Sequence, residues 1–147
     1  MLPEIPTYPV RVRLPILWGE MDSLGHVNNT AYLRWFEEAR IQYIHASGLA
    51  NDGAPGVILA HQRCDYLLPL TYPGTIEARV SAIRLGRTSL TLSFVIHAVE
   101  LGLDAAKGEG VLVAFDYADR QSIPVPEAVR ARVIAFEQAG PGQFKVT

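Results

Sequence analysis

The sequence has 147 residues, 49% of them hydrophobic, which fits one globular domain over residues 1–147 with a substantial core. Its 13 basic and 15 acidic side chains give a net charge of −2, so the charge balance indicates no binding to nucleic acid or anionic membranes. The single cysteine excludes an intramolecular disulfide framework. No stretch approaches the ~20 apolar residues of a membrane span, and MLPEIPTYPV lacks the features of a signal peptide. We therefore expect a soluble, cytoplasmic protein.

The chain opens with an alternating strand and a polar loop. Residues 9–18 read PVRVRLPILW, and their hydrophobic side chains alternate with proline or arginine as in a half-buried strand. Pro15 predicts an edge position or a bend in that strand. Residues 19–29 then lose the periodicity and gain Gly, Asp, Ser and Asn, which favour turns.

A long amphipathic helix is predicted after the loop. Asn28 or Asn29 can cap its start, and Gly48 can adopt the left-handed conformation that follows an end near Ser47. One face of this helix collects aromatic and small side chains and the opposite face collects polar ones: Tyr32, Trp35, Phe36, Ala39, Tyr43 and Ala46 against Arg34, Glu38 and His45. We expect this helix to form the core.

A longer strand is predicted in VILAHQRCDYLLPL, residues 57–70. One side of it is expected to carry Ile58, Ala60, Cys64, Tyr66 and Leu68. The other side changes from apolar to polar along the strand: Val57 and Leu59 give way to His61, Arg63 and Asp65. The strand is therefore predicted to leave the core and to face a groove or a partner chain.

The second half of the chain predicts a meander and a short helix. The segments are, in order, strands over 75–83 and 89–99 joined by the turn LGRT, a turn region over 102–110, a strand over 111–117, a helix over 126–140 with Pro126 in its first position, and a loose tail over 141–147. Strands that follow one long helix, without βαβ alternation, indicate an α+β domain. A sheet that curls around the aromatic face of the helix would bury it.

This order of elements resembles the hotdog-fold acyl-CoA thioesterases, in the branch that contains 4-hydroxybenzoyl-CoA thioesterase and the long-chain acyl-CoA thioesterases. The resemblance spans nearly the whole chain. Its motifs are Asp22-x-x-Gly25-His26-Val27-Asn28-Asn29-x-x-Tyr32, Phe36-Glu37-Glu38-Ala39-Arg40, Tyr66-Leu67-x-Pro69 and Gly86-x-x-Ser89. It implies a hotdog fold, in which an antiparallel sheet of about five strands wraps around the long helix and a short helix ends the chain.

The resemblance also implies a site and an assembly. The aspartate that corresponds to Asp22 is the family's catalytic carboxylate, and a backbone N–H at the helix start, here that of Asn29, polarises the thioester carbonyl. The family forms homodimers, often dimers of dimers, with the acyl-CoA in a groove between subunits. The sequence from His26 to Asn29 resembles the long-chain acyl-CoA and acyl-carrier-protein thioesterases. No cofactor is implied, because coenzyme A is part of the substrate.

The residues alone leave the chemistry of Asp22 open. A turn aspartate commonly accepts loop N–H bonds, whereas a carboxylate beside a helix N-terminus can attack a carbonyl or activate water while backbone donors stabilise the oxyanion. Asp22 would act as a nucleophile through a mixed anhydride or as a general base. His26 is either an auxiliary catalytic residue or a structural histidine. The candidates for substrate binding are Asn28, Tyr32, Arg63, Arg87 and Ser89.

Other residues and other activities also fit parts of this sequence. Glu37 and Glu38 would supply the carboxylate in another hotdog branch, but Arg34 and Arg40 lie at the spacing of ordinary helix ion pairs. Cysteine and histidine spacings predict no metal site. A non-catalytic module that binds acyl thioesters is the second hypothesis, and a hotdog dehydratase or hydratase is the third. Neither the acyl group nor the choice between coenzyme A and carrier protein follows from the sequence.

Overall fold

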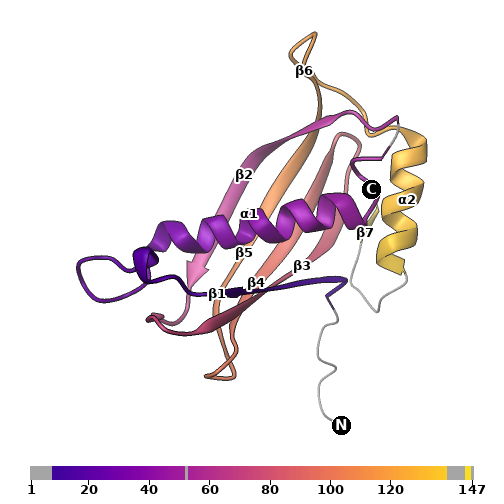
Figure 1. The fold of residues 1–147 in the computed structure, drawn as a ribbon. Coiled ribbons are helices and arrows are strands. Elements are labelled where there is room, and N and C mark those ends of the chain that lie inside the picture. The colour runs from indigo at the N-terminus through magenta and orange to yellow at the C-terminus, as the bar shows by residue number, and fades with distance from the viewer. Residues whose placement is uncertain (1–7, 52, 139–144, 147) are drawn as a thin grey trace.

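The computed structural model describes residues 8–51, 53–138 and 145–146. One long helix lies across a curved antiparallel sheet, and a shorter helix packs at one end (Figure 1). The elements in chain order are β1 (Val10–Pro15), the 3-10 turn η1 (Trp18–Glu20), α1 (Asn29–Ala46), β2 (Gly56–Tyr66), β3 (Thr75–Leu85), β4 (Ser89–Ala98), β5 (Leu103–Asp116), β6 (Gln121–Ser122), α2 (Glu127–Gln138) and β7 (Lys145–Val146). No helix in these residues is long and apolar enough to cross a membrane.

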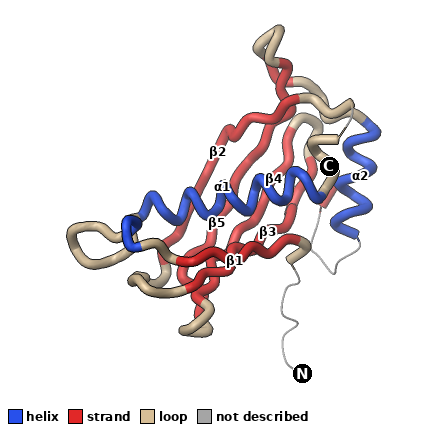
Figure 2. Tube along the Cα trace, viewed as in Figure 1, coloured by secondary structure: helices blue, strands red, loops and turns tan. Residues whose placement is uncertain are grey.

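The sheet has the strand order β1-β3-β4-β5-β2, with antiparallel pairing throughout this path. β1 is an edge strand, which confirms the position predicted from Pro15. β6 extends β5 as a short hairpin, and β7 pairs with β3 in parallel. β2 is the other edge, and it connects the end of α1 to the sheet (Figure 2).

Helix α1 begins and ends at the predicted signals. The side chain of Asn28 accepts a hydrogen bond from the Thr30 N–H at 2.9 Å, and Gly48 has a φ of 81° just past the C-cap Ser47. The predicted buried face is confirmed for its aromatic residues, but Ala46 is exposed. The chain turns at Ser47, so the apolar surface is continued by the buried Leu49 instead.

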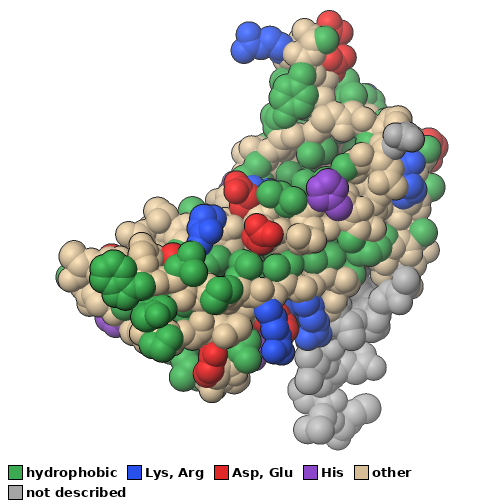
Figure 3. Space-filling model, in the orientation of Figure 1, with side chains coloured by type: hydrophobic (Ala, Val, Ile, Leu, Met, Phe, Trp, Pro, Cys, Tyr) green, Lys and Arg blue, Asp and Glu red, His purple; other side chains and the backbone are tan. Residues whose placement is uncertain are grey.

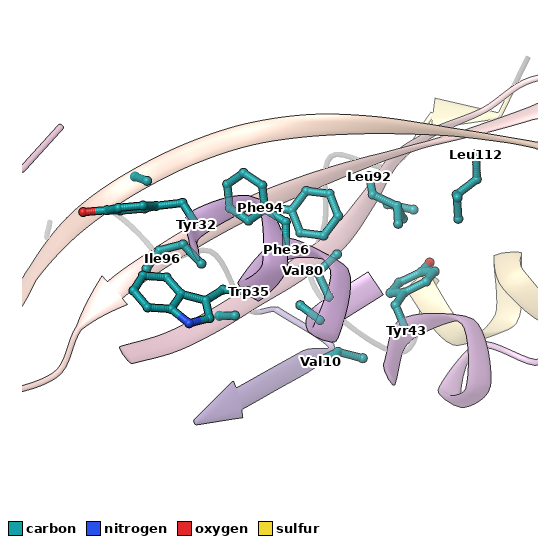
Figure 4. Packing of buried hydrophobic residues seen from close by; sticks show 14 of the residues in the cluster. Val10, Tyr32, Trp35, Phe36, Tyr43, Val80, Leu92, Phe94, Ile96 and Leu112 are labelled. Carbon is teal, nitrogen blue, oxygen red and sulfur yellow. The ribbon is translucent and has the colours of Figure 1, made fainter. Parts of the chain in front are cut away.

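The core is formed between α1 and the inner face of the sheet (Figure 4). The ring of Phe36 on α1 stacks on Phe94 of β4 with centroids 4.9 Å apart. A Cβ on Gly108 would overlap the backbone oxygen of Arg63 and would lie 3.0 Å from the Phe36 ring. The predicted turn region over 102–110 is confirmed at Gly102 and wrong for 103–110, which belong to β5, because Gly108 admits close approach within a strand.

The faces of β2 also differ from the prediction. The register slips between Leu59 and His61, which makes Ala60 a bulge. Leu59 then pairs with the buried Leu112, whereas Ile58 pairs with Val113 on the outer face. The assignment of Ile58 to the same face as Cys64 is therefore wrong. The polar residues His61, Arg63 and Asp65 do lie together on the outer face, as their pairing with residues 107–111 of β5 requires.

Helix α2 packs near the C-terminal end of α1, and its buried carboxylate Glu137 bonds to Tyr43 of α1. The Tyr43 hydroxyl and the Ala82 N–H donate to Oε1 of Glu137 at 2.5 Å and 2.6 Å. Burial raises the pKa of Glu137 above its ordinary value, although both hydrogen bonds oppose this shift. The helix begins one residue after Pro126. The predicted loose tail is wrong for Lys145–Val146, which form β7, and the rest of that tail lies outside the described residues.

Candidate active site

A short hairpin over residues 20–28, here called the loop hairpin, connects η1 to the start of α1. Its inner pair is an antiparallel bridge between Met21 and Val27. The Asp22 N–H donates to the His26 carbonyl at 2.7 Å, and the Asn28 N–H donates to the Glu20 carbonyl at 2.8 Å. Asp22 and Asn28, the residue that caps helix α1, therefore lie in one hydrogen-bonded hairpin.

The Asp22 carboxylate uses one oxygen to hold the loop hairpin. Its Oδ1 accepts hydrogen bonds from the Leu24 N–H at 2.8 Å and from the His26 N–H at 3.3 Å. Its Oδ2 accepts none from the residues that the structure describes. The side chain therefore has the structural role of a turn aspartate and keeps a second oxygen for a ligand.

The two asparagines at the helix start have different roles. The Asn28 side chain accepts from both the N–H and the hydroxyl of Thr30 at 2.9 Å and 2.8 Å. The Asn29 N–H, at the first helical position, has no acceptor within the described part of the chain. Unpaired N–H groups and the helix dipole favour negative charge at this position. The His26 side chain is exposed and makes no hydrogen bond to described residues.

Tyr66 lies at the candidate site, and the sequence assigned it no function. Its hydroxyl donates to the Asn29 carbonyl at 3.1 Å and so ties the last residue of β2 to the first residue of α1. Its ring meets Tyr32 edge to face at 5.1 Å. Burial raises the pKa of Tyr32 to about 12, and its hydroxyl donates to the Leu68 carbonyl at 3.2 Å. Tyr32 is therefore a buried support of the helix start. The only sequence signal for Tyr66 was its place in the motif Tyr66-Leu67-x-Pro69.

We expect Tyr66→Phe to lower kcat for the thioester hydrolysis that the family resemblance implies by about 3- to 10-fold with little change in KM, because one hydrogen bond contributes roughly 0.5–1.5 kcal/mol. The change frees the Asn29 peptide that the hydroxyl holds. Steady-state kinetics measure the effect. Tyr117→Phe is the matched control, since its hydroxyl donates to the Val57 carbonyl at 2.9 Å near the other end of β2. Equal kinetics for both variants would contradict a positioning role for Tyr66.

The remaining predicted substrate residues lie away from the loop hairpin. Arg63 is on the outer face of β2, with Asp65 at 3.9 Å and Glu109 at 3.7 Å. Arg87 lies in the β3–β4 turn and Ser89 is the first residue of β4; the Arg87 carbonyl accepts from the Val125 N–H just before α2. This turn is near the C-terminal end of α1 (Figure 1). A single chain therefore does not bring Arg63, Arg87 or Ser89 together with Asp22.

The alternative carboxylates are partly in ion pairs. Glu37 pairs with Arg40 at 3.6 Å, but Arg34 pairs with Glu20 of the loop hairpin at 3.1 Å. Glu38 has no ion pair among the described residues. No group of three metal-ligating side chains occurs within residues 8–51, 53–138 and 145–146.

One long helix against a curved antiparallel sheet, as seen here, is also the fold of known thioesterases. A solved thioesterase from Thermus thermophilus, complexed with coenzyme A and Zn, is 37% identical, with a TM-score of 0.78 over 89% of this chain and 96% of that one. A thioesterase superfamily protein from Jannaschia sp. CCS1 is 27% identical, with a TM-score of 0.80 over 92% of this chain and 86% of that one.

The expected hotdog fold is thus confirmed. The model of the Thioesterase-like superfamily matches residues 16–133, which include the loop hairpin, α1 and the whole meander. The chain belongs to this superfamily.

Proposed function

We propose that this protein hydrolyses acyl thioesters of coenzyme A or acyl carrier protein to a free acid and a thiol. The observation that carries the proposal is the loop hairpin, where Asp22 Oδ2 and the Asn29 N–H both lack partners among the described residues. Membership of the Thioesterase-like superfamily supports the reaction class. The coenzyme A bound to the Thermus relative supports coenzyme A as the thiol that the reaction releases.

In the proposed mechanism, Asp22 acts on the thioester carbonyl while the Asn29 N–H donates to its oxygen. As a nucleophile, the carboxylate forms a mixed anhydride and expels the thiolate, and water then hydrolyses the anhydride and regenerates Asp22. As a general base, it takes a proton from the attacking water. A thiolate is a good leaving group, so neither route requires a strong general acid. His26, exposed at the same hairpin, is the proposed auxiliary.

We propose that a second copy of the chain completes the substrate groove by lying along β2. Among the described residues this strand pairs with β5 alone, and none of its own residues is fully buried. An unpaired edge of this length is a template for another strand. Exposed apolar side chains lie on or next to β2, namely Leu59, Tyr66 and Leu67, and in or next to the loop hairpin, namely Leu17, Trp18 and Leu24. Figure 3 shows hydrophobic side chains gathered on the surface at the loop hairpin end of the molecule. Light scattering of the intact protein is expected to give at least a dimer, and a monomer at assay concentration would contradict this proposal.

A non-catalytic acyl-thioester-binding module is the second candidate, because Asp22 Oδ1 is already engaged in holding the loop. Product analysis separates the candidates. We expect the purified protein, incubated with aliphatic acyl-CoAs of graded length and with aryl-CoAs, to release one free thiol for each free acid. Saturable binding without release would favour the module, and a modified acyl group still attached to coenzyme A would favour a dehydratase or hydratase.

A further inference from the structure

Three arginines from two neighbouring strands gather around one carboxylate on the outer face of the sheet. Arg11 and Arg13 lie on β1, and Arg79 and Glu77 lie on β3. Their guanidinium nitrogens lie 3.3 Å, 3.0 Å and 2.7 Å from the Glu77 oxygens, in the order Arg11, Arg13, Arg79. Basic side chains with an acidic one between them are visible at this edge, below β1 (Figure 3). We call this group the arginine cluster.

The arginine cluster carries more positive than negative charge. Glu77 is only 6% exposed. Burial opposes its ionisation, but hydrogen bonds from Arg79 and Arg13 outweigh burial and hold the pKa of Glu77 below its ordinary value. One carboxylate therefore faces three guanidinium groups. The next acid on this face is Asp104, 2.8 Å from His97, and with it the balance is three guanidinium groups against two carboxylates. A local excess of positive charge remains in a chain whose net charge is −2.

The strand register places two of the three arginines side by side. Arg11 stands directly opposite Arg79 in the β1–β3 ladder, a position at which like charges destabilise a sheet. Each arginine uses a single nitrogen to reach Glu77, and its other guanidinium nitrogens bond to no described residue. The Arg13 side chain is 67% exposed and that of Arg79 is 17% exposed. Glu77 thus holds three guanidinium groups in place, and the two on β1, Arg11 and Arg13, keep N–H groups exposed to a ligand, whereas Arg79 is mostly covered.

We propose that the arginine cluster is a binding site for a doubly charged phosphate group, on the opposite face of the sheet from α1 and separate from the loop hairpin. Arginine matches phosphate oxygens through paired N–H donors, and tethering by Glu77 reduces the entropy lost on binding. Two sources supply this chemistry: inorganic phosphate and the 3′-phosphate of coenzyme A. Only the second source rests on the proposed function.

Calorimetric titration of the intact protein at constant ionic strength tests the proposal. The probes are inorganic phosphate, coenzyme A and 3′-dephospho-coenzyme A. We expect saturable phosphate binding that weakens by about tenfold in Arg13→Gln and again in Arg13→Gln/Arg79→Gln, since each change removes a charge-assisted hydrogen-bond donor. Arg84→Gln, at an exposed position of β3, is the matched control and is expected to bind phosphate as the wild type does.

The probes distinguish the two sources of phosphate. Coenzyme A that binds more weakly to Arg13→Gln, while its 3′-dephospho form binds both proteins equally, identifies the 3′-phosphate. Weakened binding of inorganic phosphate alone identifies free phosphate. Equal affinity of wild type and Arg13→Gln for every probe would overturn the proposal, as would a changed oligomeric mass in Arg13→Gln with unchanged phosphate binding. Binding is measured without turnover, so failed hydrolysis leaves this result unaffected.

A second variant tests the site through protein stability, so that a destabilised protein still gives an informative result. Glu77→Gln retains all three guanidinium groups and removes the only carboxylate among them. We expect its melting temperature to be low in phosphate-free buffer and to rise on addition of phosphate by more than that of the wild type. An equal response of both proteins, or no response, would contradict the site.

Discussion

Asp22→Asn is expected to lower kcat for acyl-CoA hydrolysis on the order of 10²–10⁴-fold, the range attributed to a positioned acid or base. The amide oxygen of asparagine can still accept the bonds that Leu24 and His26 donate to Oδ1. The loop hairpin therefore keeps its shape, and only the negative charge and the ability to take a proton or attack a carbonyl are lost. The change separates the structural role of the side chain from its chemistry.

Stopped or continuous detection of the released thiol measures this effect, with the melting temperature as a check of folding. Ser23→Ala is the matched control, because Ser23 is the exposed neighbour in the same hairpin and its side chain bonds to no described residue. Full activity in a folded Asp22→Asn protein would contradict a catalytic role for Asp22 and leave only its structural role in the loop hairpin.

Asn29→Pro is expected to lower kcat by roughly 10²–10³-fold, the cost of losing one oxyanion donor. Proline removes the N–H and is otherwise well suited to the first position of a helix. The preceding residue already has an extended conformation, with Asn28 at φ −61° and ψ 141°, which is the region that a following proline requires. The Asn29 carbonyl that accepts from Tyr66 is retained.

Asn29→Ala separates the backbone from the side chain at the same position. It keeps the N–H and removes the amide, so its kcat is expected to stay close to that of the wild type. Comparable losses in the alanine and proline variants would mean that the side chain, rather than the peptide N–H, acts on the substrate.

Local chemistry explains which features could be predicted from the sequence. The start and end of α1 depend on signals within a few residues, the Asn28 cap and the left-handed Gly48, and both were predicted. The clean alternation over 75–83 and 89–99 likewise predicted the hairpin that β3 and β4 form. The position of Asp22 next to the helix start follows from the same short stretch of chain.

Features that depend on contacts between distant segments could not be predicted. Gly108 reads as a turn residue until the Phe36 ring and the Arg63 carbonyl are placed against it. The bulge at Ala60 has no composition signal, yet it reverses the faces of the first half of β2. The bond from Tyr66 to Asn29 joins residues 37 positions apart, so its role at the helix start became evident only in the folded chain.

We propose that the carboxylate of the loop hairpin, rather than one on α1, carries the reaction. The most direct test compares kcat/KM of Asp22→Asn and Glu38→Gln on the same acyl-CoA, under conditions where both variants are folded. Glu38 is the appropriate rival because it is half-buried on α1 without an ion pair among the described residues. We predict that Asp22→Asn loses nearly all activity and that Glu38→Gln keeps most of it. The reverse pattern would place the catalytic carboxylate on α1 and contradict the mechanism.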